Sequence, residues 1–376
     1  MIATLLLGAW LGALSQAQLS EIHHALSTGR VADALALLEP LTRAYPNDPL
    51  VAGLLGRARL HAGDAAGAVA PLERSLRKLS NDGEGFNNLG VALMQLNRVK
   101  KAAQAFARAV VLRPRDPQSW RNLAGAYTNL DRRSDAAKAW ARYTSFVPAD
   151  GEARCVYGGV LLELERVRDA AVHLRAGSKT ASDSVCLHDY ADALGRLGEH
   201  DEALKILTRL IRLDPKNAHA HYLRAYILVG QTRHAIPQGQ DAALKAIKKA
   251  LSLAPKRAAN HHLHGYILGV LGRHEEALKA HGRARDLAPK DARYQAAEAI
   301  ARVRVGEGGK VFKQLRVMVR QDPENLEARR ALAHVYMARR QWKKAERLLR
   351  QAPGAPLSAR LDLAVVLATE QNRGSS

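Results

Sequence analysis

The chain has 376 residues, with 57 Lys+Arg against 36 Asp+Glu, a formal net charge of +21 and two cysteines. Apolar residues make up 47% of the chain and charged residues 25%, which excludes a largely disordered protein and is typical of an ordered soluble one. Two cysteines are too few for a disulfide scaffold, and an aromatic content of 5% favours many small helical contacts over one large core.

The first seventeen residues predict a secretory signal peptide. Residues 2–14 are an uncharged apolar run, and Ser15-Gln16-Ala17 offers small residues spaced as an export cleavage site requires. We therefore predict cleavage after about Ala17 and export to the periplasm or cell envelope. No Lys or Arg precedes the run, so the alternative is an apolar N-terminal cap on a cytoplasmic protein. The run is short for a membrane-spanning helix, which needs about 20 apolar residues.

From residue 34 onward an alanine recurs in steps of 34 residues, with one step of 33 and one of 40. Twelve residues before most of these alanines stands a small residue such as Gly56 or Gly90, and four residues after stands a large one such as Leu72 or Phe106. The small residues let two helices approach closely while the large one fills the groove beside them. The recurring alanine positions, with Val311 replacing alanine once, are Ala34, Ala68, Ala102, Ala136, Ala170, Ala203, Ala243, Ala277, Val311 and Ala345.

Turn and breaker residues follow the same repeat. Proline recurs near the end of most repeats, where it ends one helix pair and begins the next. Glycine falls where the two helices of a repeat turn, at Gly29, Gly63, Gly198, Gly272 and Gly306. No stretch shows sustained strand-like alternation. The pattern predicts helix pairs throughout and no sheet.

The third and fourth repeats carry nearly the full pattern of a known family. They run from Phe86-Asn87-Asn88-Leu89-Gly90 to Pro114 and from Trp120-Arg121-Asn122-Leu123-Ala124 to Pro148. This resembles the tetratricopeptide repeat family. The resemblance implies an all-α, right-handed α-solenoid of about ten helix-turn-helix repeats with a C-terminal capping helix. It also implies a concave groove, lined by the first helix of each repeat, that holds a peptide or helix of a partner protein.

The expected organisation is a signal peptide over 1–17, a repeat array over 18–352, and a capping helix and tail over 353–376. The cap keeps the open end of the array soluble. About six extra residues near 230–240 predict a loop that contains Pro237 and Gly239. The repeats are expected near 15–48, 49–82, 83–116, 117–150, 151–183, 184–217, 218–257, 258–291, 292–325 and 326–352.

Packing is expected to be least regular in the seventh to ninth repeats. There Arg224, His264 and Glu298 stand in a column that holds leucine in other repeats.

The expected groove residues fall into three groups along the chain. In the third and fourth repeats, Asn88 and Asn122 stand at matching positions, and the family often uses an asparagine there to hold a peptide backbone. Histidines and tyrosines of the sixth to eighth repeats form a polar-aromatic strip, and three arginines of the last two repeats suit an acidic peptide. The full set is Asn87, Asn88, Arg121, Asn122, His188, Asp189, Asp192, His219, Tyr222, Tyr226, His262, Tyr266, Arg293, Arg304 and Arg330.

Other chemistry is weakly supported. His188 and Asp192 with His219 or His262 could in principle hold a divalent metal, but a histidine-rich groove is more often wettable surface, and we predict no metal and no cofactor. The histidines could instead make binding sensitive to pH. The segment Gly306–Lys310 lacks a preceding strand and reads as a helix-to-helix turn, not a phosphate loop. No catalytic signature is present, so we predict that the chain is not an enzyme.

Cys155 and Cys186 are expected in first helices of adjacent repeats, near the groove. We interpret them as two small buried residues, and a disulfide in an exported protein is the alternative. Most basic residues are expected on second helices or turns, facing the convex side as a solvated surface. These include Lys100-Lys101, Arg132-Arg133, Lys248-Lys249, Lys256-Arg257 and Lys343-Lys344.

The sequence therefore favours a non-enzymatic protein-interaction scaffold, a basic protein that binds a partner segment in its groove and serves in assembling an envelope or secreted complex. The alternative is a binder of an anionic surface, membrane or nucleic acid, through its basic convex face. Nucleic acid is the less favoured ligand because aromatic residues do not alternate with the charges, and a small-molecule substrate is not expected.

Overall fold

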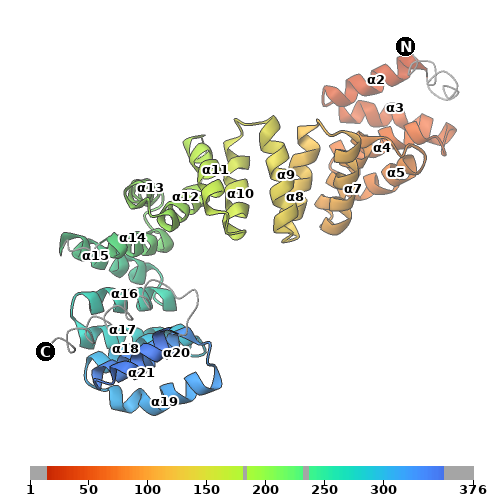
Figure 1. Ribbon diagram of the computed structural model, residues 1–376. Helices are drawn as coiled ribbons and strands as arrows, with labels where there is room; N and C mark the ends of the chain where they lie inside the picture. Colours follow the sequence, from red (N-terminus) through yellow and green to blue (C-terminus); the bar gives the residue numbers. More distant parts are fainter. Residues whose placement is uncertain (1–14, 181–183, 232–236, 351–376) are drawn as a thin grey trace. The chain divides into compact units, whose positions relative to one another are not determined.

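A computed structural model describes residues 15–180, 184–231 and 237–350, and all its regular structure in these ranges is helical (Figure 1). In most of the described repeats, the first helix packs closely on the second helix of its own repeat and also contacts a helix of an adjacent repeat. This confirms the expected all-α solenoid of helix pairs. No helix in the described ranges is both long enough and apolar enough to cross a membrane.

The helices come in consecutive pairs, most of them 13 or 14 residues long. First helices carry even numbers and second helices odd numbers. Their bounds are α2 (Gln16–Ser27), α3 (Val31–Ala44), α4 (Pro49–His61), α5 (Ala65–Lys78), α6 (Gly83–Gln95), α7 (Val99–Leu112), α8 (Pro117–Asn129), α9 (Arg133–Phe146), α10 (Gly151–Glu163), α11 (Val167–Thr180), α12 (Ser184–Leu197), α13 (His200–Leu213), α14 (Ala218–Gln231), α15 (Pro237–Leu253), α16 (Ala258–Val270), α17 (His274–Leu287), α18 (Ala292–Arg304), α19 (Gly308–Gln321), α20 (Leu326–Ala338) and α21 (Trp342–Arg350).

Local sequence fixes where the first helices begin. Asp48, Asp82, Asp116 and Asp150 each stand just before a first helix and accept backbone N–H groups of its first turn. An aspartate at this position satisfies donors that the helix itself cannot, and its charge is favourable at the positive end of the helix dipole. The beginnings of α4, α6, α8 and α10, and so the phase of their side chains, are therefore set locally.

The columns of small and large residues are the contacts that close each helix pair. A Cβ atom added to Gly56, Gly90 or Gly158 would overlap the large residue of the facing helix, which is Leu72, Phe106 or Leu174 respectively. The column alanines are fully or nearly fully buried. Because close approach leaves no room for a side chain at these glycines, each glycine sets the spacing of its pair.

Wherever the structure describes the tight turn between the two helices of a repeat, one residue of that turn is left-handed. The five expected glycines all have positive φ, from 74° to 87°. Four other repeats make the same turn with a side chain, at Asn97, Asp131, Glu165 and Arg340, with φ of 55–57°. These four are a departure from the glycine pattern, and they show that the turn is imposed by packing of the two helices even where the residue disfavours it.

The chain divides into two compact units, an N-terminal unit of residues 1–193 and a C-terminal unit of residues 194–376. Each has cores of its own. Ile22, Leu38 and Leu54 belong to one in the N-terminal unit, and Ile247 and Ile267 belong to one in the C-terminal unit.

The signal peptide and the capping helix predicted at the two ends of the chain lie largely outside the described residues. The C-terminal capping helix and tail (353–376) and the apolar run (2–14) are outside them entirely. Ser15 is described, and it caps α2 through a reciprocal pair of hydrogen bonds with Gln18. Ala17, the expected cleavage position, therefore lies in the first turn of α2.

The extra residues of the seventh repeat do not form only a loop. The helix α15 begins at Pro237 and includes Gly239, and it is 17 residues long where the other second helices have at most 14. The expectation of a loop at these two residues is therefore wrong. Residues 232–236, the rest of the expected loop, lie outside the described residues.

The ninth repeat packs differently because of Glu298. Its carboxylate is buried on the leucine column and pairs with Arg285 at 2.9 Å and Arg302 at 2.8 Å. A polar pocket of about 160 Å³ lies beside it, lined in part by Lys310 and Gln314 of α19. A charged group needs partners where leucine needs only apolar contact. The helices α18 and α19 accordingly pack on each other less extensively than the helices of most other described repeats.

Candidate functional site

In the N-terminal unit, a chain of amide hydrogen bonds crosses from one first helix to the next. Gln118 Nε2 donates to Asn122 Oδ1 at 3.0 Å, and Asn122 Nδ2 donates to Asn87 Oδ1 at 2.9 Å. Asn88, beside Asn87, is half-buried and makes no hydrogen bond with any described residue. The structure thus brings Asn87 and Asn122 of consecutive repeats together and leaves the Asn88 amide available.

Next to this amide chain two glycines leave the helix backbone uncovered by side chains of their own. A Cβ atom on Gly125 would meet nothing within 4 Å, and one on Gly159 would meet only Asp189 Oδ2 at 3.1 Å. Val156, on the same helix as Gly159, is 39% exposed. A ligand main chain could therefore approach the backbone of α8 closely while its side chains reach apolar and amide groups.

Arginines on this face have acidic partners from the next repeat. Arg57 pairs with Glu84 at 2.8 Å, and Arg121 pairs with Glu152 at 3.6 Å. The charge of Arg121 is thus partly met within the protein, which makes the inner face of the N-terminal unit close to neutral at these positions.

His188, Asp189 and Asp192 lie on α12, at the end of the N-terminal unit. His188 Nδ1 is 3.0 Å from Asp189 Oδ1, and all three side chains are half-buried. Across the described part of the chain, no group of three or more His, Cys, Asp or Glu side chains could hold a metal ion.

In the C-terminal unit, aromatic rings and an arginine form a stack on α14. The His219 ring lies parallel to the Tyr222 ring with centroids 5.6 Å apart. The Arg257 guanidinium lies 5.3 Å from the Tyr222 ring centroid, and its Nη1 atom is 2.7 Å from His219 Nδ1. Burial raises the pKa of Tyr222, so this phenol keeps its proton over the physiological range.

The other members of the strip differ in exposure. Tyr226 is 56% exposed and Tyr266 is 37% exposed. The His262 ring instead packs between Tyr294 and His281, at centroid distances of 5.3 and 5.1 Å. Burial lowers the pKa of His262 to about 4, so it is neutral at physiological pH. The two tyrosines are thus presented to solvent, whereas His262 is packed against Tyr294 and His281.

The three expected arginines are also in different environments. Arg293 pairs with Asp291, the N-cap of its own helix, at 2.6 Å. Arg304 is exposed, and its Nη1 atom lies 3.2 Å from the position that a Cβ of Gly269 would take. It makes no ion pair with the described residues. Arg330 is half-buried.

Several residues of these faces were not predicted from the sequence. Gln118, Gly125 and Gly159 extend the amide face, and Arg257 completes the tyrosine strip although it stands in a turn expected on the outside. The repeat could have indicated the two glycines, since Gly125 stands three residues after Asn122 and Gly159 stands 34 residues after Gly125. Nothing in the sequence indicates that the Arg257 side chain reaches His219, 38 residues earlier.

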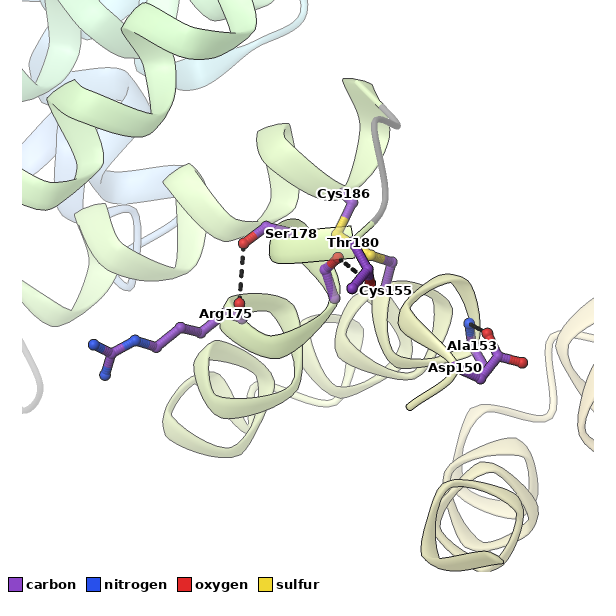
Figure 2. Close-up of a disulfide and its surroundings, with 8 residues drawn as sticks. Asp150, Ala153, Cys155, Arg175, Ser178, Thr180 and Cys186 are labelled. Atoms are coloured by element: carbon purple, nitrogen blue, oxygen red, sulfur yellow. Dashed lines mark hydrogen bonds between the residues drawn. A yellow bond between two sulfur atoms is a disulfide. The ribbon is translucent and has the colours of Figure 1, made fainter. Parts of the chain in front are cut away.

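The two cysteines form a disulfide between α10 and α12, with Cα atoms 5.1 Å apart (Figure 2). Both are buried, but their interpretation as unpaired residues is wrong. Gly177 of the intervening helix allows the bond, because a Cβ atom there would lie 2.5 Å from Cys155 Sγ. Spacing alone could not predict the pairing, because it depends on how closely α10, α11 and α12 approach.

Most of the basic residues expected on second helices or turns are exposed. Lys100, Lys101, Lys248 and Lys249 are exposed on second helices, and Arg132 pairs with Asp135 at 2.6 Å. Such exposed pairs contribute roughly 0–1 kcal/mol each and mainly keep the surface soluble.

The segment Gly306–Lys310 holds the end of the turn between α18 and α19 and the first residues of α19. Gly306 has a φ of 87°, and Lys310 pairs with Glu307 at 2.8 Å.

Comparison with known proteins gives one family. Three tetratricopeptide repeat models match the chain, one at residues 19–83 and 87–144, another at 184–227 and a third at 309–368. Together they span more than half of the sequence. No curated protein sequence matches the chain.

Several solved structures are similar to the chain. YrrB, described as a tetratricopeptide repeat protein with an unusual peptide-binding site, is 19% identical over 51% of this chain and 96% of its own, with a TM-score of 0.46. PilF of Pseudomonas aeruginosa is 16% identical over 58% of this chain and 99% of its own, with a TM-score of 0.45. Human IFIT1, solved as a dimer with PPP-AAAA, is 16% identical over 88% of both chains, with a TM-score of 0.39.

Proposed function

The chain belongs to the tetratricopeptide repeat family, and from this premise we propose that it is a non-enzymatic scaffold that holds an extended segment of a partner protein on the inner face of its repeats. The proposed contact residues are those expected from the sequence together with Gln118, Gly125, Gly159 and Arg257. The scaffold role fits a chain whose described residues are used almost entirely to build helix pairs.

The amide chain from Gln118 through Asn122 to Asn87 supports this proposal most directly. An amide donates and accepts, so it can bond either group of a peptide backbone without selecting a side chain. The bonds within the chain orient Asn122, and Gly125, three residues further along α8, leaves space for a main chain. Orienting the binding groups before the ligand arrives reduces the entropy lost on binding.

A displayed library of random peptides, selected on the full chain, tests the groove. The selected peptides should bind the double variant Asn88→Ala, Asn122→Ala about tenfold more weakly or worse, since each lost amide contact contributes about 1 kcal/mol. The variant Gln104→Ala, on the exposed side of α7, is the matched control and should bind as wild type does. Equal affinity for the double variant and the control would remove the amide face from the proposal.

We also propose that the protein is exported and works in assembling an envelope or secreted complex. The disulfide between Cys155 and Cys186 supports export, because such bonds persist mainly in oxidising compartments. The apolar run before Ser15 is the second support. Because Ala17 lies in the first turn of α2, a cut just before Ser15, which would keep the whole helix and its N-cap, fits the structure as well as a cut after Ala17.

Two measurements on protein taken from its source organism test export. Amino-terminal sequencing should find a new end near residues 14–18, and alkylation without reductant should leave both cysteines unlabelled. An intact Met1 together with two labelled cysteines would place the protein in a reducing compartment.

A further inference from the structure

The inner face of the C-terminal unit differs in charge from that of the N-terminal unit. The helices α14 and α16 contain no Asp or Glu. On α18 the only carboxylate is Glu298, which is buried and paired with Arg285 and Arg302. Asp291, just before α18, pairs with Arg293. Negative charge on these three first helices is therefore already matched within the protein.

Two arginines of this face keep their charge. The Arg257 guanidinium contacts a histidine nitrogen and an aromatic ring, and it forms no ion pair in the described ranges. His219 Nδ1 can accept from Arg257 only when it carries no proton, so the contact leaves the positive charge uncompensated. Arg304 likewise has no acidic partner among the residues described, and Gly269 gives it room to lie across α16.

Two exposed tyrosines lie with these cations. Tyr226 is one turn beyond Tyr222, the ring that Arg257 covers, and Tyr266 is three residues before Gly269, over which Arg304 lies. Both tyrosines occupy the same repeat position on neighbouring helices that contact each other. The strip therefore offers exposed tyrosine rings about one helical turn from the residues that the two guanidinium groups contact.

We infer that the C-terminal unit binds an acidic protein segment that also carries aromatic side chains. The carboxylates would pair with Arg257 and Arg304 through charge-assisted hydrogen bonds, and the aromatic groups would pack on Tyr226 and Tyr266. On the N-terminal unit, by contrast, Arg121 is already paired with Glu152. The inference rests on the proposed function, because both place a partner segment on side chains of the first helices. It concerns different residues and a different ligand chemistry.

A protein segment fits this strip better than a nucleic acid. Grooves for single strands follow the phosphate backbone with a series of cations, one for nearly every contacted phosphate. Here two uncompensated arginines stand beside two tyrosines, which suits a few carboxylates spaced by apolar side chains.

Fluorescence anisotropy of the full chain with a labelled peptide of repeated Glu-Glu-Phe tests the inference. We expect saturable binding, with a Lys-Lys-Phe peptide and a Glu-Glu-Gly peptide each about tenfold weaker, because charge and rings both contribute. Arg304→Gln should weaken the Glu-Glu-Phe peptide by about tenfold, as expected for loss of a charge-assisted bond. Arg283→Gln on the exposed side of α17 removes the same charge elsewhere and should have no effect.

Two further variants complete the test. Tyr226→Ser with Tyr266→Ser should abolish preference for the phenylalanine-containing peptide, and circular dichroism checks that the variants remain helical. The Asn88→Ala, Asn122→Ala chain should bind Glu-Glu-Phe unchanged, so failure of the amide face and failure of this strip give different results. Equal binding by Arg304→Gln and Arg283→Gln, or tighter binding of a thymidine oligonucleotide that Arg304→Gln weakens, overturns the inference.

Discussion

His281 takes the position that a large apolar side chain fills in most other repeats. Its ring lies 2.8 Å from where a Cβ of Gly265 would be, and His262 contacts its other side. Burial lowers the pKa of His281 to about 3, with His262, Arg304 and His264 also opposing its positive charge. The ring is therefore held neutral inside the eighth repeat, although a histidine in water would gain a proton well above that pH.

This histidine makes the free energy of unfolding depend on pH. Its pKa is lower in the folded chain than in the unfolded chain, so its contribution is complete above about pH 6.5 and is lost as pH falls towards about 3. Urea denaturation at pH 7.5 and at pH 5 measures this. As the pH is lowered between these values, we expect the unfolding free energy of wild type to fall by about 2 kcal/mol more than that of His281→Leu. His23→Gln, on an exposed side chain, should follow the wild-type profile. Parallel profiles for wild type and His281→Leu would contradict the buried, neutral assignment.

At the scale of the helix, glycine has two opposite roles at neighbouring positions of one repeat pattern. Gly90 lies against Phe106 and sets the distance between α6 and α7, whereas Gly125 lies on the inner face of α8 with open space before it. Both are interior helix positions with the same intrinsic cost. Packing on one side and solvent on the other decide what each glycine does.

The two glycines therefore predict opposite effects of the same substitution. Gly125→Ala should stabilise the protein by up to about 1 kcal/mol through helix propensity. Gly90→Ala should destabilise it by about 1–2 kcal/mol, because the Phe106 ring must shift. Thermal or urea denaturation of both variants measures this. A larger residue, as in Gly125→Leu, should retain the fold but weaken peptides held by the amide face; undiminished binding would argue against a ligand main chain over α8.

The sequence predicted the helix pairs because their causes are local. Caps such as Asp82, turn residues such as Gly63 and the pairing of Gly90 with Phe106 all lie within one repeat. The contact of Arg257 with His219 was not predictable in this way, because it depends on how far a long side chain extends across a repeat boundary. For the same reason the hydrogen bond between Asn122 and Asn87 could not be predicted from helix phase alone.

At the scale of the molecule, the disulfide adds a covalent link between two repeats that would otherwise be held together by packing and the backbone alone. It connects first helices of consecutive repeats across 31 residues of sequence. Stability in repeat arrays is roughly a sum of repeat and interface contributions, so a covalent link at one interface couples two of these contributions directly.

Removal of this link should lower stability measurably. Closing a loop of this length is worth about 3–4 kcal/mol by the chain-entropy account. We therefore expect Cys155→Ala, Cys186→Ala, or reduction of wild type, to lower the midpoint of chemical denaturation while far-ultraviolet circular dichroism of the native chain stays the same. Reductant should have no effect on the double variant. An unchanged midpoint after complete reduction would mean that helix packing alone holds this interface.

The same bond also changes what a break in the chain would do. A peptide bond cut between Cys155 and Cys186 would not separate the two fragments, because the sulfur atoms would still join them. The nicked protein would keep its full mass until a reductant was added. In a compartment that contains proteases, this repeat boundary could be cleaved without losing the connection between the N-terminal and C-terminal units.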